Sequence, residues 1–179
     1  MQALIYIVNS LLQYLLVTAF ILRLLLPLLR ANMRNPISQA VIRVTNPLVM
    51  PLRRILPPIG RVDTASVVAL VLVQLLTTAI IGSMLGFDAS NPHFLLRAGG
   101  LALLTSIIQL YWICVLIYVL MSWIAPQNYN PAADLLASIC EPIMRPIRRI
   151  IPPIAGLDLT AVFVLIGLQA LLIALPQAF

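Results

Sequence analysis

The chain has 179 residues, of which 62% are hydrophobic and only 9% are charged, and its mean hydropathy is +1.07. This composition excludes an ordinary water-soluble domain, because such domains carry about 25% charged residues. The formal net charge is +6, the isoelectric point is about 10.2, and all eleven basic residues are arginine. Such a charge suits nucleic acid or a membrane surface, and its position along the chain decides between them.

Four apolar stretches are long enough to cross a bilayer core, which takes about 20 helical residues. They are Ala3–Leu26, Ser66–Leu85, Leu101–Ile124 and Leu159–Leu175. We expect helices, because the bilayer core contains no water to satisfy the backbone and the alternating pattern of a membrane barrel is missing from the sequence. The predicted fold class is therefore an all-α membrane protein with four transmembrane helices.

The distribution of arginine predicts the orientation of these spans. Nine arginines lie in the first and third loops, whereas the middle loop has only Arg97. Because cytoplasmic loops carry an excess of basic residues, we expect the first and third loops in the cytoplasm, and both termini and the middle loop in the periplasm. The basic charge is thus first a topology signal, and nucleic acid is not an expected partner.

One segment rich in proline and arginine occurs twice, 95 residues apart. Residues 47–59 read Pro-Leu-Val-Met-Pro-Leu-Arg-Arg-Ile-Leu-Pro-Pro-Ile, and residues 142–154 read Pro-Ile-Met-Arg-Pro-Ile-Arg-Arg-Ile-Ile-Pro-Pro-Ile. Asn35-Pro36 and Asn130-Pro131 repeat at the same distance. We therefore expect a first repeat over residues 1–86, an outer linker over 87–100 and a second repeat over 101–179. Each repeat holds two spans, so the two should be parallel-oriented helical hairpins.

A short amphipathic helix is predicted after each Asn-Pro pair, on the cytoplasmic side. Its apolar stripe in the second repeat consists of Leu135, Leu136, Ile139 and Ile143. The stripe in the first repeat consists of Ile37, Val41, Val44 and Leu48. Such a helix either lies in the headgroup plane or packs under the bundle, and both alternatives stay open. We expect the prolines beyond it to end the helix and to form a stiff, extended elbow.

Two arginine pairs are the best candidates for a binding function, namely Arg53-Arg54 and Arg148-Arg149. The planar guanidinium matches phosphate and carboxylate groups, and a cation near anionic lipid is worth about 1 kcal/mol. An alternative of equal weight is that these arginines only set topology. The rigid frame of prolines favours function slightly, because a topology signal needs no fixed spacing. The prolines of this frame are Pro47, Pro51, Pro57, Pro58, Pro142, Pro146, Pro152 and Pro153.

An aspartate precedes the second span of each repeat, and these residues are Asp63 and Asp158. The simplest role is to cap the helix by accepting hydrogen bonds from its free N–H groups. A second role is to pair with the arginines. We therefore group both aspartates with the arginine pairs as residues of a site for lipid or a protein partner.

Every predicted span also carries an amide side chain. The intramembrane polar candidates are Asn9, Gln13, Gln74, Gln109 and Gln169. Asn9 and Gln13 share one helix face, as do Thr105 and Gln109. The simpler interpretation is hydrogen bonding between helices, at about 0.6–2 kcal/mol per bond, and the alternative is a polar pathway for an ion or small solute. Arg23, near the cytoplasmic end of the first span, is expected to extend to lipid phosphate.

The sequence contains no nucleophile–base set, no glycine-rich phosphate loop and no cluster of metal ligands. The two cysteines, Cys114 and Cys140, follow neither a disulfide nor a metal pattern. We therefore predict no enzymatic activity, no catalytic residue, no metal and no cofactor.

These features together resemble the YggT family of small membrane proteins built from YGGT repeats. The resemblance rests on Asn-Pro, then Pro-x-x-x-Pro-x-Arg-Arg-x-x-Pro-Pro, then Asp and an apolar span with glutamine, and it covers nearly the whole chain twice. Ser122-Trp123 before Pro126 also resembles the family, whereas Leu22-Arg23 departs from it. The resemblance implies a helical protein of the bacterial inner membrane. It associates bacterial relatives with osmotic stress and ion uptake, and plastid relatives with cytochrome maturation and membrane organisation.

The leading hypothesis is a non-enzymatic scaffold or assembly factor of the inner membrane. Its arginine elbows would bind anionic lipid headgroups, an unidentified membrane protein partner, or both. The alternative is an osmotic-stress or ion-transport component, either a small channel subunit or a regulator of one. Four helices would have to form a homo-oligomer to enclose a pore, and the amides would then line it.

Overall fold

The structure is a computed structural model that describes residues 2–60, 62–124, 130–149 and 160–176. The first helix consists of α1 (Gln2–Asn9), the π-helical segment η1 (Ser10–Val17) and α2 (Thr18–Leu28). The following helices are α3 (Pro36–Arg53), α4 (Thr64–Met84), α5 (Pro92–Ile124), α6 (Pro131–Arg148) and α7 (Thr160–Ala174). Helices are the main regular structure in these ranges, beside one isolated bridge between Ile59 and Val62.

Three helices are long and apolar enough to cross a membrane, namely Ala3–Leu28, Thr64–Met84 and Pro92–Ser122. They confirm long apolar helices at the first three predicted spans. The apolar α7 has 15 residues in the described part of the chain, which is about 22 Å of helix against a hydrocarbon core of about 30 Å. The fourth span therefore stays a prediction.

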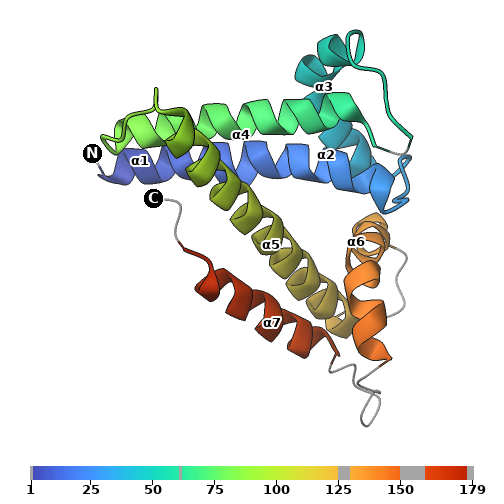
Figure 1. The fold of residues 1–179 in the computed structure, drawn as a ribbon. Coiled ribbons are helices and arrows are strands. Elements are labelled where there is room, and N and C mark those ends of the chain that lie inside the picture. The colour runs from blue at the N-terminus through green and yellow to red at the C-terminus, as the bar shows by residue number, and fades with distance from the viewer. Residues whose placement is uncertain (1, 61, 125–129, 150–159, 177–179) are drawn as a thin grey trace.

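The helix α5 is longer than the span predicted there. It has 33 residues and begins at Pro92, so residues 92–100, which were expected in the outer linker, are helical. Its length of about 50 Å exceeds the thickness of the bilayer core. Figure 1 shows α5 running diagonally across the first helix and α4, and a tilt of this kind is how a long helix is accommodated.

The bundle has two different ends (Figure 1). The short helices α3 and α6 lie at one end, whereas α1 begins and α7 ends at the other. The helix α3 packs against α2 and α4, α6 packs against α5 and α7, and α3 also contacts α6. We call the end formed by α3, α6 and residues 54–60 and 149 the arginine end. Both predicted arginine pairs lie at this end, although they are far apart in the sequence.

The helices α3 and α6 correspond residue for residue. Pro36–Arg53 and Pro131–Arg148 are offset by 95 residues at both ends. Each is capped by an asparagine whose side-chain oxygen accepts the N–H two residues on, at 3.0 Å for Asn35 and 2.9 Å for Asn130. An asparagine cap followed by proline at the first helical position is a strong start signal, so both copies begin at the same point.

Both helices continue through the prolines just beyond the predicted stripes, Pro51 and Pro146, which were expected to end them. Pro47 and Pro51 lie inside α3, and Pro142 and Pro146 lie inside α6. This part of the elbow prediction is wrong. All four prolines are exposed, so the carbonyls that lose a helical N–H partner lie on the outer face, where water or headgroups can donate to them. The arginine pairs consequently occupy helix ends and not an extended segment.

The helix α6 packs under the bundle with the predicted stripe inward. Leu135 and Ile139 are buried, and Leu136 and Ile143 pack against the core. The apolar stripe of α6 is therefore confirmed, and so is the packing alternative for this helix.

The helix α3 uses a different face. It buries Ser38, Thr45 and Val49, whereas Val44 and Leu48 of the predicted stripe are 62% and 38% exposed. The prediction for this stripe is wrong except for Val41, which packs against the core. The reason is Arg23 of α2, because its guanidinium needs the polar side of α3 as a hydrogen-bond partner. An apolar face of α3 is left outward.

Candidate functional site

An ion pair joins the end of α3 to the start of α4 at the arginine end. The guanidinium of Arg53 donates to the carboxylate of Asp63. The connection between them is also held, because the Thr64 hydroxyl donates to the Pro57 carbonyl at 2.6 Å. The Arg53 side chain is 45% exposed and that of Asp63 is 12% exposed. The pair therefore lies at the surface with its acidic member turned inward.

The carboxylate of Asp63 is an anchor for arginine. Asp63 occupies the N-cap position of α4 but accepts no backbone N–H there within the described residues, and its Oδ2 accepts the Ser66 hydroxyl at 2.7 Å. Burial alone would raise the pKa of this carboxyl. The hydrogen bonds from Arg53 and Ser66 and the charges of Arg53 and Arg23 outweigh it and hold the pKa below its ordinary value of 3.8. For Asp63 the capping prediction is wrong, and the pairing prediction is confirmed.

The second arginine of each pair has a different environment from the first. Arg54 and Arg149 are exposed, and neither side chain has an ion-pair partner within the described residues. Arg148 instead donates to Glu141 in the same helix, at 3.1 Å. Each pair thus consists of one anchored arginine and one available arginine. The predicted residues Asp158, Pro152 and Pro153 lie outside the described residues.

Apolar side chains flank the available arginine of the first repeat. Ile55 and Ile59 are 77% and 72% exposed, and Met50 is 55% exposed. Arg43 of α3 is also exposed. A surface that mixes arginine with exposed apolar side chains is typical of the interfacial region of a membrane, where the side chains enter the acyl boundary and the cations meet phosphate.

The role of Arg23 was not found from the sequence. Its side chain is 6% exposed, and its Nη1 donates to the Ile42 carbonyl at 3.2 Å, the Thr45 hydroxyl at 3.2 Å and the Asn46 side-chain oxygen at 2.9 Å. The prediction that Arg23 extends to lipid phosphate is therefore wrong. A buried guanidinium needs acceptors, and the polar Thr45-Asn46 pair in α3 was the signal that pointed to them.

The amides of Gln13 and Gln74 join three helices within the membrane-spanning part. The Gln13 Nε2 atom donates to the Ser106 hydroxyl at 2.6 Å and to the Ala102 carbonyl at 3.2 Å, and lies 3.3 Å from Gln74 Oε1. Gln74 Nε2 donates to the Thr78 hydroxyl at 3.2 Å. Hydrogen bonding between helices, the simpler of the two interpretations, is confirmed for these two amides.

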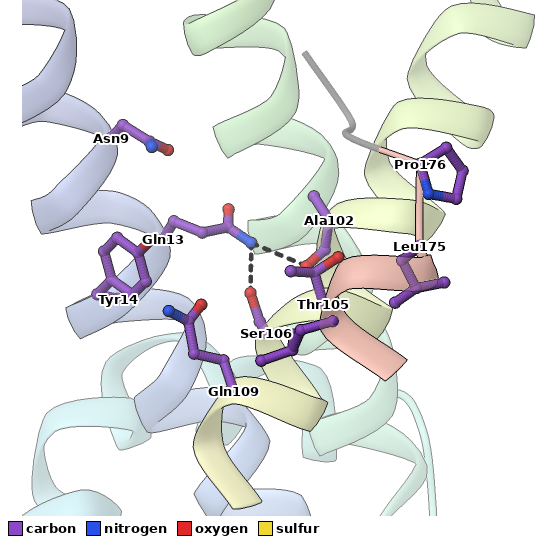
Figure 2. A pocket seen from close by; sticks show the side chains of 10 residues that line it. Asn9, Gln13, Tyr14, Ala102, Thr105, Ser106, Gln109, Leu175 and Pro176 are labelled. Carbon is purple, nitrogen blue, oxygen red and sulfur yellow. Dashed lines mark hydrogen bonds between the residues drawn. The ribbon is translucent and has the colours of Figure 1, made fainter. Parts of the chain in front are cut away.

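A cavity of about 370 Å³ lies beside this network, between the first helix, α5 and α7 (Figure 2). Asn9, Gln13 and Gln109, three of the five predicted polar residues, line it. Gln169 does not join them, because it is exposed on α7. Its counterpart 95 residues earlier, Gln74, is 2% exposed. The expectation that every span turns an amide toward the centre is therefore wrong for the last helix.

The arginine end and the amide-lined cavity can bind ligands through charge and hydrogen bonds. Burial, with smaller contributions from Cys114 and Glu141, raises the pKa of the Cys140 thiol to about 12, so the thiol stays protonated and unreactive at neutral pH. The described residues contain no group of three or more metal-ligating side chains.

Comparison with known proteins extends over both halves of the chain. The model of the CCB3/YggT family matches residues 1–84 and 98–179. An uncharacterised protein of Pseudomonas aeruginosa is 38% identical over 150 residues, which cover 83% of this chain and 76% of that protein. An uncharacterised protein of Vibrio alginolyticus, from the proC 3′ region, is 40% identical over 83% of this chain and 80% of its own length.

A third relative is the uncharacterised protein YggT of Escherichia coli K12, which is 29% identical over 152 residues. The match covers 84% of this chain and 78% of that protein. No solved structure matches the chain.

Proposed function

Because the chain belongs to the CCB3/YggT family and carries three helices long enough to span a membrane, we propose that it is a non-enzymatic scaffold or assembly factor of the bacterial inner membrane. In this proposal the arginine end binds anionic lipid headgroups on the cytoplasmic side. Both chain termini then lie in the periplasm, as the distribution of arginine predicts. A membrane protein partner would be held next to these lipids.

The observation that carries the proposal is the contrast between the two arginines at the end of α3. Arg53 is fixed by Asp63, and Arg54 is exposed with no ion-pair partner in the described residues. If Asp63 neutralised both guanidinium groups, no positive charge would remain at this helix end to bind a ligand. One anchored and one available arginine keep a positive charge directed outward from a helix end of fixed position.

The surroundings of Arg54 favour lipid over a soluble anion. The neighbouring Ile55 is 77% exposed, and a large apolar side chain gains free energy by entering the acyl region, at about 25 cal/mol per Å² of buried area. A headgroup phosphate would then lie at the level of the guanidinium. In the second repeat Arg149 occupies the matched position at the end of α6, so two such contacts are expected at the arginine end.

The proposal is tested by measuring the lipids that co-purify with the full-length protein from mixed anionic and zwitterionic membranes. The variants are Arg54→Gln, Arg149→Gln and the double variant. The matched control is Arg97→Gln, which removes one exposed charge outside the arginine end. A juxtamembrane cation is worth about 1 kcal/mol, so each single variant should lower anionic lipid enrichment about fivefold and the double variant about thirtyfold, whereas the control should leave it unchanged.

Equal enrichment in the wild type, the double variant and the Arg97→Gln control would overturn the proposal. The arginines would then serve topology alone. The transport alternative would become the leading hypothesis, and solute flux into liposomes containing only this protein would be the next measurement.

A further inference from the structure

The cavity beside the Gln13–Gln74 network contains polar groups that the network does not use. Asn9 comes from the first helix, and Thr105 and Gln109 come from α5. None of these three side chains has a hydrogen-bond partner in the described part of the chain. Figure 2 shows the amides of Asn9, Gln13 and Gln109 pointing into the same space. All of them lie within segments long and apolar enough to span a membrane.

The unpartnered amides of Asn9 and Gln109 are half-buried, and a ligand or ordered water in the cavity can bond to them. Burying an amide in an apolar medium without a hydrogen bond costs several kcal/mol, and the bilayer core supplies no donors or acceptors. The neighbouring Gln13 shows the contrast, because its amide is satisfied by Ser106, Ala102 and Gln74. Asn9 and Gln109 therefore remain as free donors and acceptors on facing walls of the cavity.

The lining also defines the charge of the ligand. No lining residue is acidic or basic. An ion inside such a cavity would lose its hydration without a compensating charge. Amide groups offer both donors and acceptors, as does a hydroxyl. The cavity is therefore suited to an uncharged molecule that carries hydroxyl groups.

The remaining wall is apolar. Leu172 lines it from α7, Leu175 and Pro176 line it from the segment just after α7, and the ring of Tyr14 lines it from the first helix. A polyol has C–H faces that pack on apolar side chains and hydroxyl edges that bond to amides. The volume of about 370 Å³ lies at the lower end of the range for ligand sites, about 300–1,000 Å³. It is sufficient for a glycerol-sized or sugar-sized group.

The backbone at this point is itself unusual. Gln13 and Tyr14 lie in η1, where the first helix is π-helical over Ser10–Val17. Short π-helical segments inside α-helices occur frequently at functional sites. The π-helical segment η1 lies at the cavity, whereas the neighbouring α2 is α-helical.

We propose that this cavity binds a neutral polyol through the amides of Asn9 and Gln109. The same chemistry has two sources, the glycerol or sugar headgroup of an uncharged lipid and a free polyol in solution. Entry from the bilayer would bring the headgroup between the first helix and α7. Entry from the aqueous side would bring the free polyol to the end of the bundle where α7 ends.

The test is saturable binding to the full-length protein in detergent micelles. The probes are dioctanoylglycerol for the lipid source, glycerol for the free source, and dioctanoyl phosphatidic acid as the charged comparison. Binding is followed by ligand-observed NMR for the wild type, Asn9→Leu, Gln109→Leu and the matched control Gln169→Leu. Neither Asn9 nor Gln109 bonds to the described protein, so both variants should fold, which retained thermal stability checks.

We expect one of the two neutral probes to bind the wild type and Gln169→Leu equally. The loss of a hydrogen-bonding amide should weaken that binding about tenfold in Asn9→Leu and in Gln109→Leu. The neutral probe that binds shows whether the ligand is a lipid headgroup or a free polyol. The absence of saturable binding by both neutral probes, equal binding to all four proteins, or equal binding of phosphatidic acid would each overturn the proposal.

Discussion

The helices α3 and α6 begin and end at matched residues, yet their hydrogen bonds have different partners. At one matched position α3 has Asn46 and α6 has Glu141. Asn46 accepts from Arg23, which comes from the preceding helix. Glu141 accepts from Arg148, which lies seven residues later in the same helix. The Arg23–Asn46 bond of the first repeat thus joins two consecutive helices, α2 and α3, whereas the Arg148–Glu141 bond of the second repeat stays within α6.

This difference shows which properties of a duplicated unit are robust. Caps and helix lengths depend on a few local residues, so they persist in both copies. The partner of a long side chain depends on what the neighbouring helix provides. Arg23 occurs only in the first repeat, and its presence turns the polar face of α3 inward. The apolar face of α3 is consequently outward, next to the available arginine Arg54.

The glutamines of the two repeats differ in the same way. Gln74 is buried against Gln13 and Thr78, whereas Gln169 is exposed on α7. The helix α4 is surrounded by α1, η1, α2, α3 and α5, whereas the main neighbours of α7 among the described helices are α5 and α6. An amide on the central helix α4 therefore finds hydrogen-bond partners on its neighbours, whereas an amide on the peripheral helix α7 stays on the outer surface.

The largest effect should come from removing an acceptor of Arg23. We expect Asn46→Leu to lower the free energy of unfolding by about 2–3 kcal/mol, because it leaves a buried guanidinium without its shortest hydrogen bond. The matched change Glu141→Gln should cost about 0.5 kcal/mol, since that ion pair is half exposed. Chemical unfolding in micelles measures both. Equal losses of unfolding free energy in the two variants would contradict this difference between the two repeats.

The next effect concerns the caps that the repeats share. Asn35 also donates to the Pro131 carbonyl of the other repeat at 2.6 Å, a contact beyond its capping bond. Asn130→Ala should cost about 1 kcal/mol for the cap alone, and Asn35→Ala about 2 kcal/mol for the cap and the bond between repeats. The same unfolding measurement compares them. A larger loss for Asn130→Ala would contradict the assignment.

The smallest effect is a dependence on pH at the arginine end. Because the folded pKa of Asp63 is lowered from 3.8, its contribution to stability is complete above that value and is lost as pH falls through the folded pKa. Asp63→Asn should cost about 1 kcal/mol at pH 7 and should remove part of the acid sensitivity. Unfolding midpoints between pH 3 and pH 7 test this. An identical pH profile in wild type and variant would exclude the Arg53–Asp63 pair as its source.

The sequence by itself determined the features that depend on local chemistry and on composition. An apolar content of 62% predicted a membrane protein, the duplication at 95 residues predicted two matched helices, and the Asn-Pro pairs predicted where they begin. The pairing of Asp63 with arginine also followed from proximity in the chain. Prolines were misjudged, because whether an interior proline is tolerated depends on whether its face is exposed, and exposure is a property of packing.

Only the tertiary structure decided which polar groups meet. Gln74 and Ser106 lie 61 and 93 residues after Gln13 in the chain, and helical periodicity gives the face of a residue but not the helix opposite it. The same holds for Arg23 and its acceptors in α3, and for the cavity between the first helix, α5 and α7. The physical reason is that burial and hydrogen bonding are properties of pairs, and the pairs are set by how helices cross.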